Sequence, residues 1–199
     1  MISNIVLQAK KYISKLLFPL KEKWYEYHNL DHTLSVYKRA SYLSIQEWLD
    51  EDLQEIIQLA ALFHDTWFIK QYDNNEPIWA KIAEKWLKEQ WYPQDKIDII
   101  KQVILATILN SPTNNKLEQI IKDADMDNLW RDDFFQLGEA LRNELKNIKW
   151  LKFTDKERYS RTASYIQIFN FFTNTQKKER NKKLKENKEE LNNKIQNIK

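Results

Sequence analysis

Three histidines are the residues best suited to chemistry, and all of them lie in the first third of the chain. His28 and His32 are four positions apart, so on a helix they share a face. His64 is followed directly by Asp65 at the end of a strongly apolar run. Burying an imidazole beside a carboxylate costs free energy unless a cation compensates for both. A divalent metal ion fits this pair, because neutral His supplies nitrogen and Asp supplies oxygen. The alternative is a histidine that meets the last carbonyls of a helix.

A group of three aspartates is the second candidate. Asp125 continues a stripe of apolar residues spaced four apart, whereas Asp123 and Asp127 point away from that stripe. A carboxylate among core residues requires a cation or several hydrogen-bond donors. From spacing alone, Asp125 is interpreted equally well as a metal ligand or as a carboxylate that pairs with a lysine or caps a neighbouring helix.

Helices must position these residues. Apolar residues recur at helical spacing along nearly the whole chain, and no segment shows sustained strand alternation. The segment 53–64 is apolar almost all round, which predicts a central buried helix. Glu139 and Glu144 fit the solvated face of a later helix. The predicted fold is therefore an all-α bundle packed around one core. Its helices are expected at residues 2–20, 32–46, 53–64 and 77–89, from 93 onward, and at 116–129, 132–149 and 155–175.

Composition excludes several other classes of protein. The chain has 199 residues and no cysteine, which excludes a disulfide scaffold, a thiolate metal site and a cysteine nucleophile. No apolar run is long enough to span a membrane. Lysines interrupt the apolar N-terminal segment, unlike the apolar region of a secretory signal. We therefore expect a soluble, cytoplasmic protein.

The formal net charge of +3 is concentrated at the C-terminus. Residues 177–199 contain nine Lys or Arg and four Glu, whereas the rest of the chain is close to neutral. This pattern predicts a domain at 1–175 and a basic Lys/Glu/Asn-rich tail at 176–199 that is helical or disordered. A solvated tail is the favoured interpretation, and contact with a nucleic acid is the alternative. The Tyr- and Phe-rich helix before the tail is interpreted as core or as the contact of a homodimer.

Three motifs, in this order and spacing, resemble the signature of the HD superfamily of metal-dependent phosphohydrolases. They are the segments 27–33 (YHNLDHT), 60–66 (AALFHDT) and 123–125 (DAD). The first is similar to the opening of small predicted HD phosphohydrolases with a YHNxxHT sequence. The resemblance implies an all-α HD domain in which an early His, the His-Asp doublet and a later Asp hold a metal ion.

Carried over residue by residue, the resemblance implies that His32, His64, Asp65 and Asp125 are the metal ligands, with Asp123 as the alternative to Asp125. Nitrogen and oxygen ligands without thiolate suit manganese, iron, cobalt, nickel or zinc.

Two further residues receive roles from the same resemblance. His28 is expected to orient a ligand or to reach the phosphate. Glu76 is the candidate general base or water-positioning residue. Relatives tend to carry a His-Glu pair where this chain has Asn75 and Glu76. The missing histidine favours one divalent metal ion over two.

The predicted function is hydrolysis of a small phosphate ester, with nucleotides among the candidate substrates, by metal-activated water. An iron-dependent oxygenase on the same scaffold is less favoured, because three histidines are few for a dinuclear centre. The alternative from a different class is a non-catalytic nucleotide- or RNA-binding regulatory module whose basic tail contacts RNA.

The tryptophan and glycine contents are both unusual. The chain has eight tryptophans and one glycine, although average usage predicts roughly 14 glycines. Glycine fits positive φ at helix ends and close backbone approach, and tryptophan does not. We hypothesise that a reassigned stop codon specifies glycine in this gene, which predicts strained or exposed indoles; the alternative is genuine tryptophan throughout. The positions concerned are Trp48, Trp67, Trp79, Trp91 and Trp130.

Overall fold

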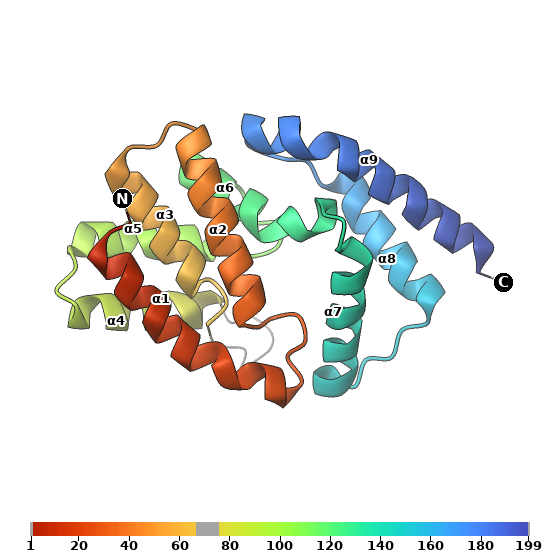
Figure 1. Cartoon of the computed structure of the whole chain (residues 1–199), viewed down its shortest axis with the longest axis horizontal. Helices are drawn as coiled ribbons and strands as arrows, with labels where there is room; N and C mark the ends of the chain where they lie inside the picture. The colour runs from red at the N-terminus through yellow and green to blue at the C-terminus, as the bar shows by residue number, and fades with distance from the viewer. Residues whose placement is uncertain (1, 67–75, 199) are drawn as a thin grey trace.

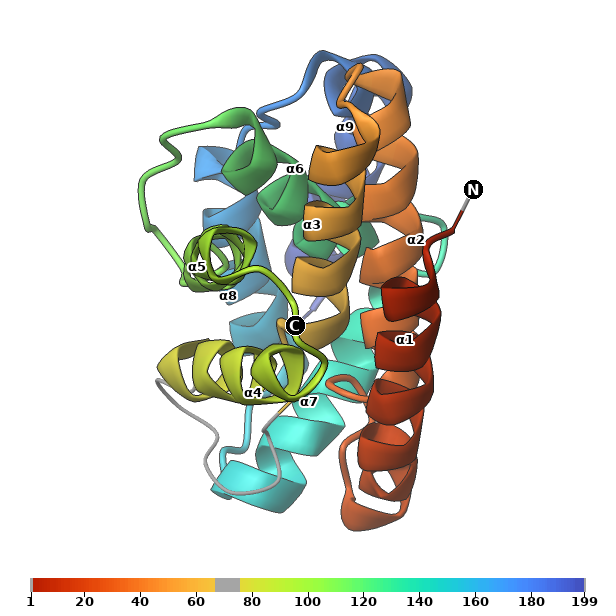
Figure 2. The same ribbon diagram turned by 90° about the vertical axis from the view of Figure 1, so that its left-hand side faces the viewer.

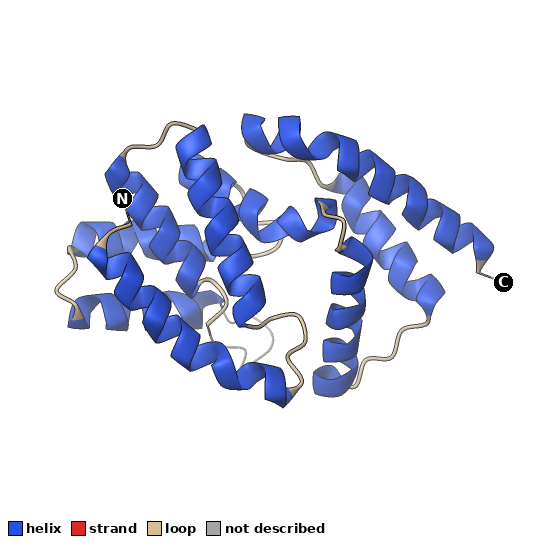
Figure 3. Ribbon diagram, in the orientation of Figure 1, coloured by secondary structure: helices blue, strands red, loops and turns tan. Residues whose placement is uncertain are grey.

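The computed structural model describes residues 2–66 and 76–198, and in these ranges every regular element is a helix (Figure 3). The all-α prediction is confirmed. None of the described helices is both long and apolar enough to serve as a membrane-spanning segment. The elements are α1 (Asn4–Leu17), η1 (Phe18–Lys23), α2 (Leu30–Gln46), α3 (Glu51–Phe63), α4 (Glu76–Glu89), α5 (Gln94–Leu105), α6 (Lys116–Asp125), η2 (Met126–Trp130), α7 (Phe134–Lys149), α8 (Asp155–Ile168) and α9 (Asn174–Asn197).

Helix α3 lies at the centre of the larger core, as its composition predicts. Asp50 begins the helix by accepting a hydrogen bond from the Leu53 N–H (2.8 Å), and two acids in the first turn complement the helix dipole. From Ile56 to Phe63 nearly every side chain is buried, because α1, α2, α4, α5 and α6 all pack against this helix. Figure 2 shows α3 between α2 and α5. The C-terminal end of α3, which carries His64, is thereby held inside the protein.

A second, smaller core lies beneath α7, α8 and α9, which occupy the other half of the molecule in Figure 1. The expectation of one core was therefore wrong. The short helix η2 redirects the chain after α6, so the C-terminal helices pack against η2 rather than against α3. Its buried members are Trp130, Phe134, Ile166, Phe171 and Leu191.

Two predicted helices end earlier than their patterns suggest. The helix expected at 116–129 stops at Asp125 and continues as η2, and the one expected at 155–175 stops at Ile168. The second break has a clear cause in Asp123. Its carboxylate accepts hydrogen bonds from the N–H groups of Phe172 (3.0 Å) and Thr173 (2.7 Å) and from the Thr173 hydroxyl (2.7 Å). These N–H groups are therefore not available to carbonyls of a continuous helix.

The basic C-terminal segment forms the long helix α9. Thr173 caps it by accepting a hydrogen bond from the Gln176 N–H (3.2 Å). One side of the helix is buried against α8 and η2, including Gln176, Asn187 and Leu191. The predicted division of the chain between residues 175 and 176 falls within the first turn of α9.

The tryptophans singled out above fall into three groups. Trp48 and Trp91 have positive φ, and their side chains are 93% and 94% exposed. Trp79 and Trp130 instead lie buried within helical segments. Trp67 lies outside the described residues. The expectation of strained, exposed indoles is thus confirmed at two of the five positions.

Candidate metal centre

The structure brings together the four side chains that the motifs single out as ligands. His32 lies in the first turn of α2, which begins where the Asn29 side chain accepts a hydrogen bond from the Asp31 N–H (2.9 Å). The other three come from the C-terminal ends of two helices. They are His64 and Asp65 after α3 and Asp125 at the last position of α6. One ligand atom from each residue lies within 4.8 Å of the corresponding atoms of the other three.

The two imidazoles approach each other through the same ring atom. His64 is fully buried, and its Nδ1 lies 2.8 Å from the Ala61 carbonyl oxygen. A carbonyl only accepts, so Nδ1 carries the proton and Nε2 of the neutral ring offers a lone pair. That Nε2 lies 3.4 Å from Nε2 of His32. Two ring nitrogens this close require a proton or another cation between them.

Two carboxylates complete the group. Asp65 Oδ2 lies 3.0 Å from His32 Nε2 and 3.3 Å from His64 Nε2. Asp125 Oδ1 lies 3.3 Å and 3.5 Å from the same two nitrogens. Ligands placed about 2.1 Å from one metal ion are separated by about 3.0 Å in an octahedron and about 3.4 Å in a tetrahedron. The observed spacing therefore fits one divalent ion without rearrangement.

The pKa values show how strongly the group attracts positive charge. Burial alone lowers the pKa of His32, but hydrogen bonds to Asp125 and Asp65 outweigh burial and raise this pKa to about 9. The pKa of His64 also lies well above its usual value, because Asp65 and Asp125 outweigh burial. Conversely, His32 and His64 outweigh burial at Asp125 and lower its pKa to about 2. A divalent ion supplies positive charge that protons on the imidazoles otherwise provide.

These values predict that metal affinity depends on pH. His32 holds a proton below pH 9 in the absence of metal, and this proton must leave before Nε2 can bind an ion. The apparent Mn²⁺ affinity should therefore rise with pH, by about tenfold per unit for each proton displaced. Calorimetric titrations with Mn²⁺ from pH 6.5 upward, in buffers of different ionisation enthalpy, measure the affinity and the protons released. A flat affinity profile without proton release would contradict this account.

Asp123, the alternative last ligand, lies elsewhere. It is fully buried, and its carboxylate accepts the three hydrogen bonds from Phe172 and Thr173. The structure thus places Asp125, and not Asp123, with the histidines. The apolar stripe on α6 correctly indicated which aspartate faces the core beside α2 and α3.

His28 lies next to the four-residue group and is oriented by Glu144. One oxygen of Glu144 hydrogen-bonds His28 Nδ1, and the other accepts from the N–H groups of Tyr27 (2.8 Å) and His28 (2.9 Å). Glu144 is fully buried, so its placement on a solvated helix face was wrong. The error is understandable, because the partners of Glu144 are more than a hundred residues away and leave no local pattern.

A cavity of about 530 Å³ opens beside the group. His28, Glu76 and three of the ligand residues line it, whereas His64 lies behind them. Glu76 therefore faces the space in which a substrate would lie. Motif analysis missed the opposite wall, which combines apolar side chains with one guanidinium. It includes Tyr27, Leu129, Leu141, Arg161, Thr162 and Tyr165.

An all-α bundle with a buried group of two histidines and two aspartates that could hold a metal ion is the arrangement of an HD domain. Residues 29–127 match the HD domain family. The chain belongs to the HD superfamily, whose members are generally hydrolases.

The overall shape is also found in a solved structure. The Lin1889 protein of Listeria innocua superimposes with a TM-score of 0.64 at 19% sequence identity, over 98% of this chain and 97% of that one. At this identity the likeness shows the fold alone. No curated protein matches the sequence.

Proposed function

We propose that the protein is a metal-dependent phosphohydrolase that cleaves a phosphate ester. The observation that carries this proposal is the convergence of His32, His64, Asp65 and Asp125 beside the cavity. These four ligands leave coordination positions for water and for a phosphoryl oxygen. A bound divalent ion supplies Lewis acidity and lowers the pKa of a water molecule.

The residues around the ligands have distinct roles in this proposal. Glu76, at the first turn of α4 and on the cavity wall, accepts the proton of the attacking water. His28 contacts the substrate phosphate, with its ring held in place by Glu144. His64 donates through Nδ1 to the Ala61 carbonyl, which fixes the orientation in which Nε2 faces the ion.

The experiment that tests this function compares metal-free and Mn²⁺-loaded protein on nucleotides and on p-nitrophenyl phosphate. We expect hydrolysis that requires the metal and that is lost in His64→Ala and Asp65→Ala. Metal binding without turnover of any substrate, together with salt-sensitive binding of RNA, would instead support a regulatory module. Because α9 is packed against the domain, the RNA arm should replace its exposed lysines, such as Lys182 and Lys185, rather than delete residues 177–199.

A further inference from the structure

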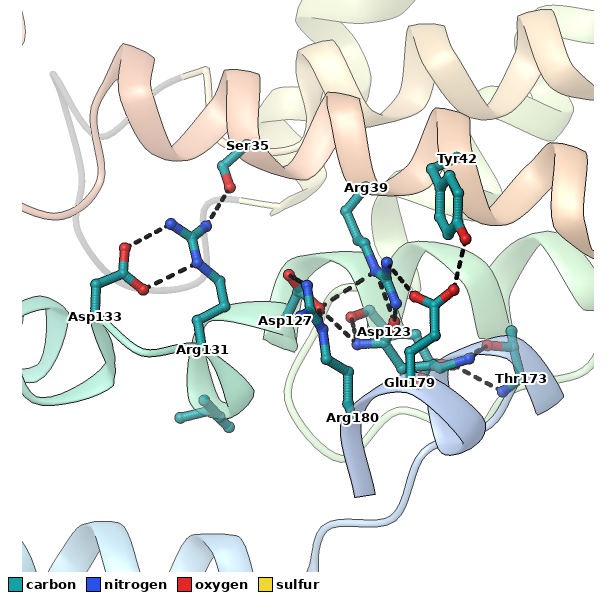
Figure 4. Close-up of polar contacts among 12 residues, drawn as sticks. Ser35, Arg39, Tyr42, Asp123, Asp127, Arg131, Asp133, Thr173, Glu179 and Arg180 are labelled. Carbon is teal, nitrogen blue, oxygen red and sulfur yellow. Dashed lines mark hydrogen bonds and ion pairs between the residues drawn. The ribbon is translucent and has the colours of Figure 1, made fainter. Parts of the chain in front are cut away.

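The N-terminal half of α9 holds the segment that carries Asp125. Asp127, on η2, is nearly buried and accepts two hydrogen bonds from Arg180, at 2.8 Å from Nε and 3.0 Å from Nη2. It also accepts from Gln176 Nε2 at 2.8 Å, and Arg39 of α2 lies 3.3 Å away. Figure 4 shows these side chains converging from α2, η2 and α9. We call Arg39, Asp127, Gln176 and Arg180 the Asp127 clamp.

Asp125 is fixed from both sides along the chain. Two residues before it, Asp123 is bound by Phe172 and by Thr173, the cap of α9. Two residues after it, Asp127 is held by the clamp. Asp125 itself lies where α6 gives way to the 3₁₀ helix η2, so the direction of its carboxylate depends on the backbone of this junction.

The clamp also reaches the helix of another candidate ligand. Arg39 lies seven residues after His32 on α2, which is about two helical turns. Besides Asp127, Arg39 contacts Gln176 (2.8 Å) and Glu179 (2.8 Å) of α9. Helix α9 therefore ties the element that carries His32 to the element that carries Asp125.

We propose that α9 positions the metal centre, with Arg180 as a positioning residue that acts through Asp127. This inference rests on the proposed function, because it requires that the four-residue group binds a metal ion. Charged pairs with bidentate geometry fix orientation better than single contacts, and supporting residues of metal ligands typically contribute 10- to 100-fold to affinity.

The test measures Mn²⁺ affinity by calorimetry in Arg180→Gln, Asp127→Asn and the double variant. Each single variant should bind about tenfold more weakly, and the double variant should be little worse than either, because both changes break one contact. Arg180→Lys, which keeps the charge but loses the bidentate geometry, should recover part of the affinity. Measurements far below the unfolding temperature separate these effects from stability.

Lys183→Gln is the matched control. Lys183 is on the same helix and pairs with the exposed Asp132 (2.7 Å), away from the clamp. It should bind Mn²⁺ as the wild type does. Unchanged Mn²⁺ affinity in Arg180→Gln would overturn the positioning role, whereas a wild-type protein that binds no Mn²⁺ would overturn the proposed function itself.

A separate observation concerns four tryptophans. Of the five non-glycine residues with positive φ in the described chain, four are tryptophans and the fifth is Asn110. All four have side chains that are 63–94% exposed, so burial does not compensate for the backbone strain. They are Trp24 (φ 72°), Trp48 (61°), Trp91 (57°) and Trp150 (58°).

Each of the four follows or ends a helix, and three show the complete bonding of a glycine C-cap. After Trp48, the Leu49 N–H bonds the Ser44 carbonyl, while Trp48 itself bonds that of Ile45. Trp91 is flanked by the same pair of bonds, and the residue after Trp24 makes the outer one while Trp24 N–H meets the backbone turn before it. This is the Schellman motif, in which the left-handed position is usually glycine.

We infer that the cell places glycine at these four positions, because a stop codon reassigned to glycine encodes them. Trp86 behaves differently: it is buried and stacks on Tyr12 at 5.6 Å, as a genuine tryptophan does. The gene should therefore carry UGA at 24, 48, 91 and 150 and UGG at 86. Peptides from the natural protein should have the mass of glycine at the four positions.

A stability measurement tests the same inference on recombinant protein. Trp48→Gly and Trp91→Gly should each raise Tm, by roughly 2–4 °C if about 1 kcal/mol of strain is relieved. Trp86→Gly should lower Tm. UGG codons at the four positions, or peptides that contain tryptophan there, would overturn the inference.

Discussion

Asp125→Asn is expected to abolish Mn²⁺ binding and to reduce metal-dependent hydrolysis by at least about 100-fold. The substitution keeps the shape of the side chain but removes one of the two negative charges that face the imidazoles. It also removes one of the two hydrogen bonds that raise the pKa of His32. The group can then no longer balance the charge of a divalent ion.

Thermal unfolding gives a direct measurement of this loss. An ion present at 100 times its dissociation constant stabilises the wild type by about 2.7 kcal/mol, which corresponds to a rise in Tm of roughly 5–10 °C. Asp125→Asn should show no such rise. Asp132→Asn, an exposed aspartate outside the group, should respond like the wild type. Asp123→Asn should lose far less affinity than Asp125→Asn, and the reverse order would show that the ligand assignment is wrong.

Glu144→Ala is expected to have the largest effect on stability, a loss of about 3–5 kcal/mol in the free energy of unfolding. The change removes the acceptor of the N–H groups of Tyr27 and His28 and of the His28 ring. Burial raises the pKa of Glu144, but its hydrogen bonds to His28 and the backbone outweigh this and lower it, so the carboxylate is charged in the interior. These contacts hold α7 against the segment before α2.

Urea denaturation measures this effect, and Glu139→Ala is its control on the same helix. The Glu139 side chain is 45% exposed and pairs with Arg142 and Arg158 at the surface, so its loss should cost less than about 1 kcal/mol. Equal losses in the two variants would contradict the structural role of Glu144.

The candidate ligands could be predicted because each lies in a short motif or on a helix face with a clear pattern. The apolar run that ends at His64 announces a buried imidazole, and the stripe through Asp125 distinguishes it from Asp123. Glu144 could not be found in this way. It lies on a helix of mixed polarity, and no local signal shows that its acceptors face Tyr27 and His28.

The C-terminal third was harder to predict than the rest for a related reason. Its helix breaks depend on hydrogen bonds between distant segments, such as those from Phe172 and Thr173 to Asp123. The periodicity of residues 155–175 continues through this break, because aromatic residues on both sides pack into the second core. Charge alone suggested a solvated tail at the position of α9, whereas contacts across the fold bury one of its faces.

The Asp127 clamp has a consequence for the order in which the protein matures during synthesis. A ribosome releases the histidine and aspartate motifs long before Arg180 emerges from its exit tunnel. A nascent chain at that stage has the donor atoms but lacks the brace that aligns them. We therefore expect full metal loading to follow termination, so that release of the finished polypeptide, and not translation of the motifs, sets when the centre becomes competent.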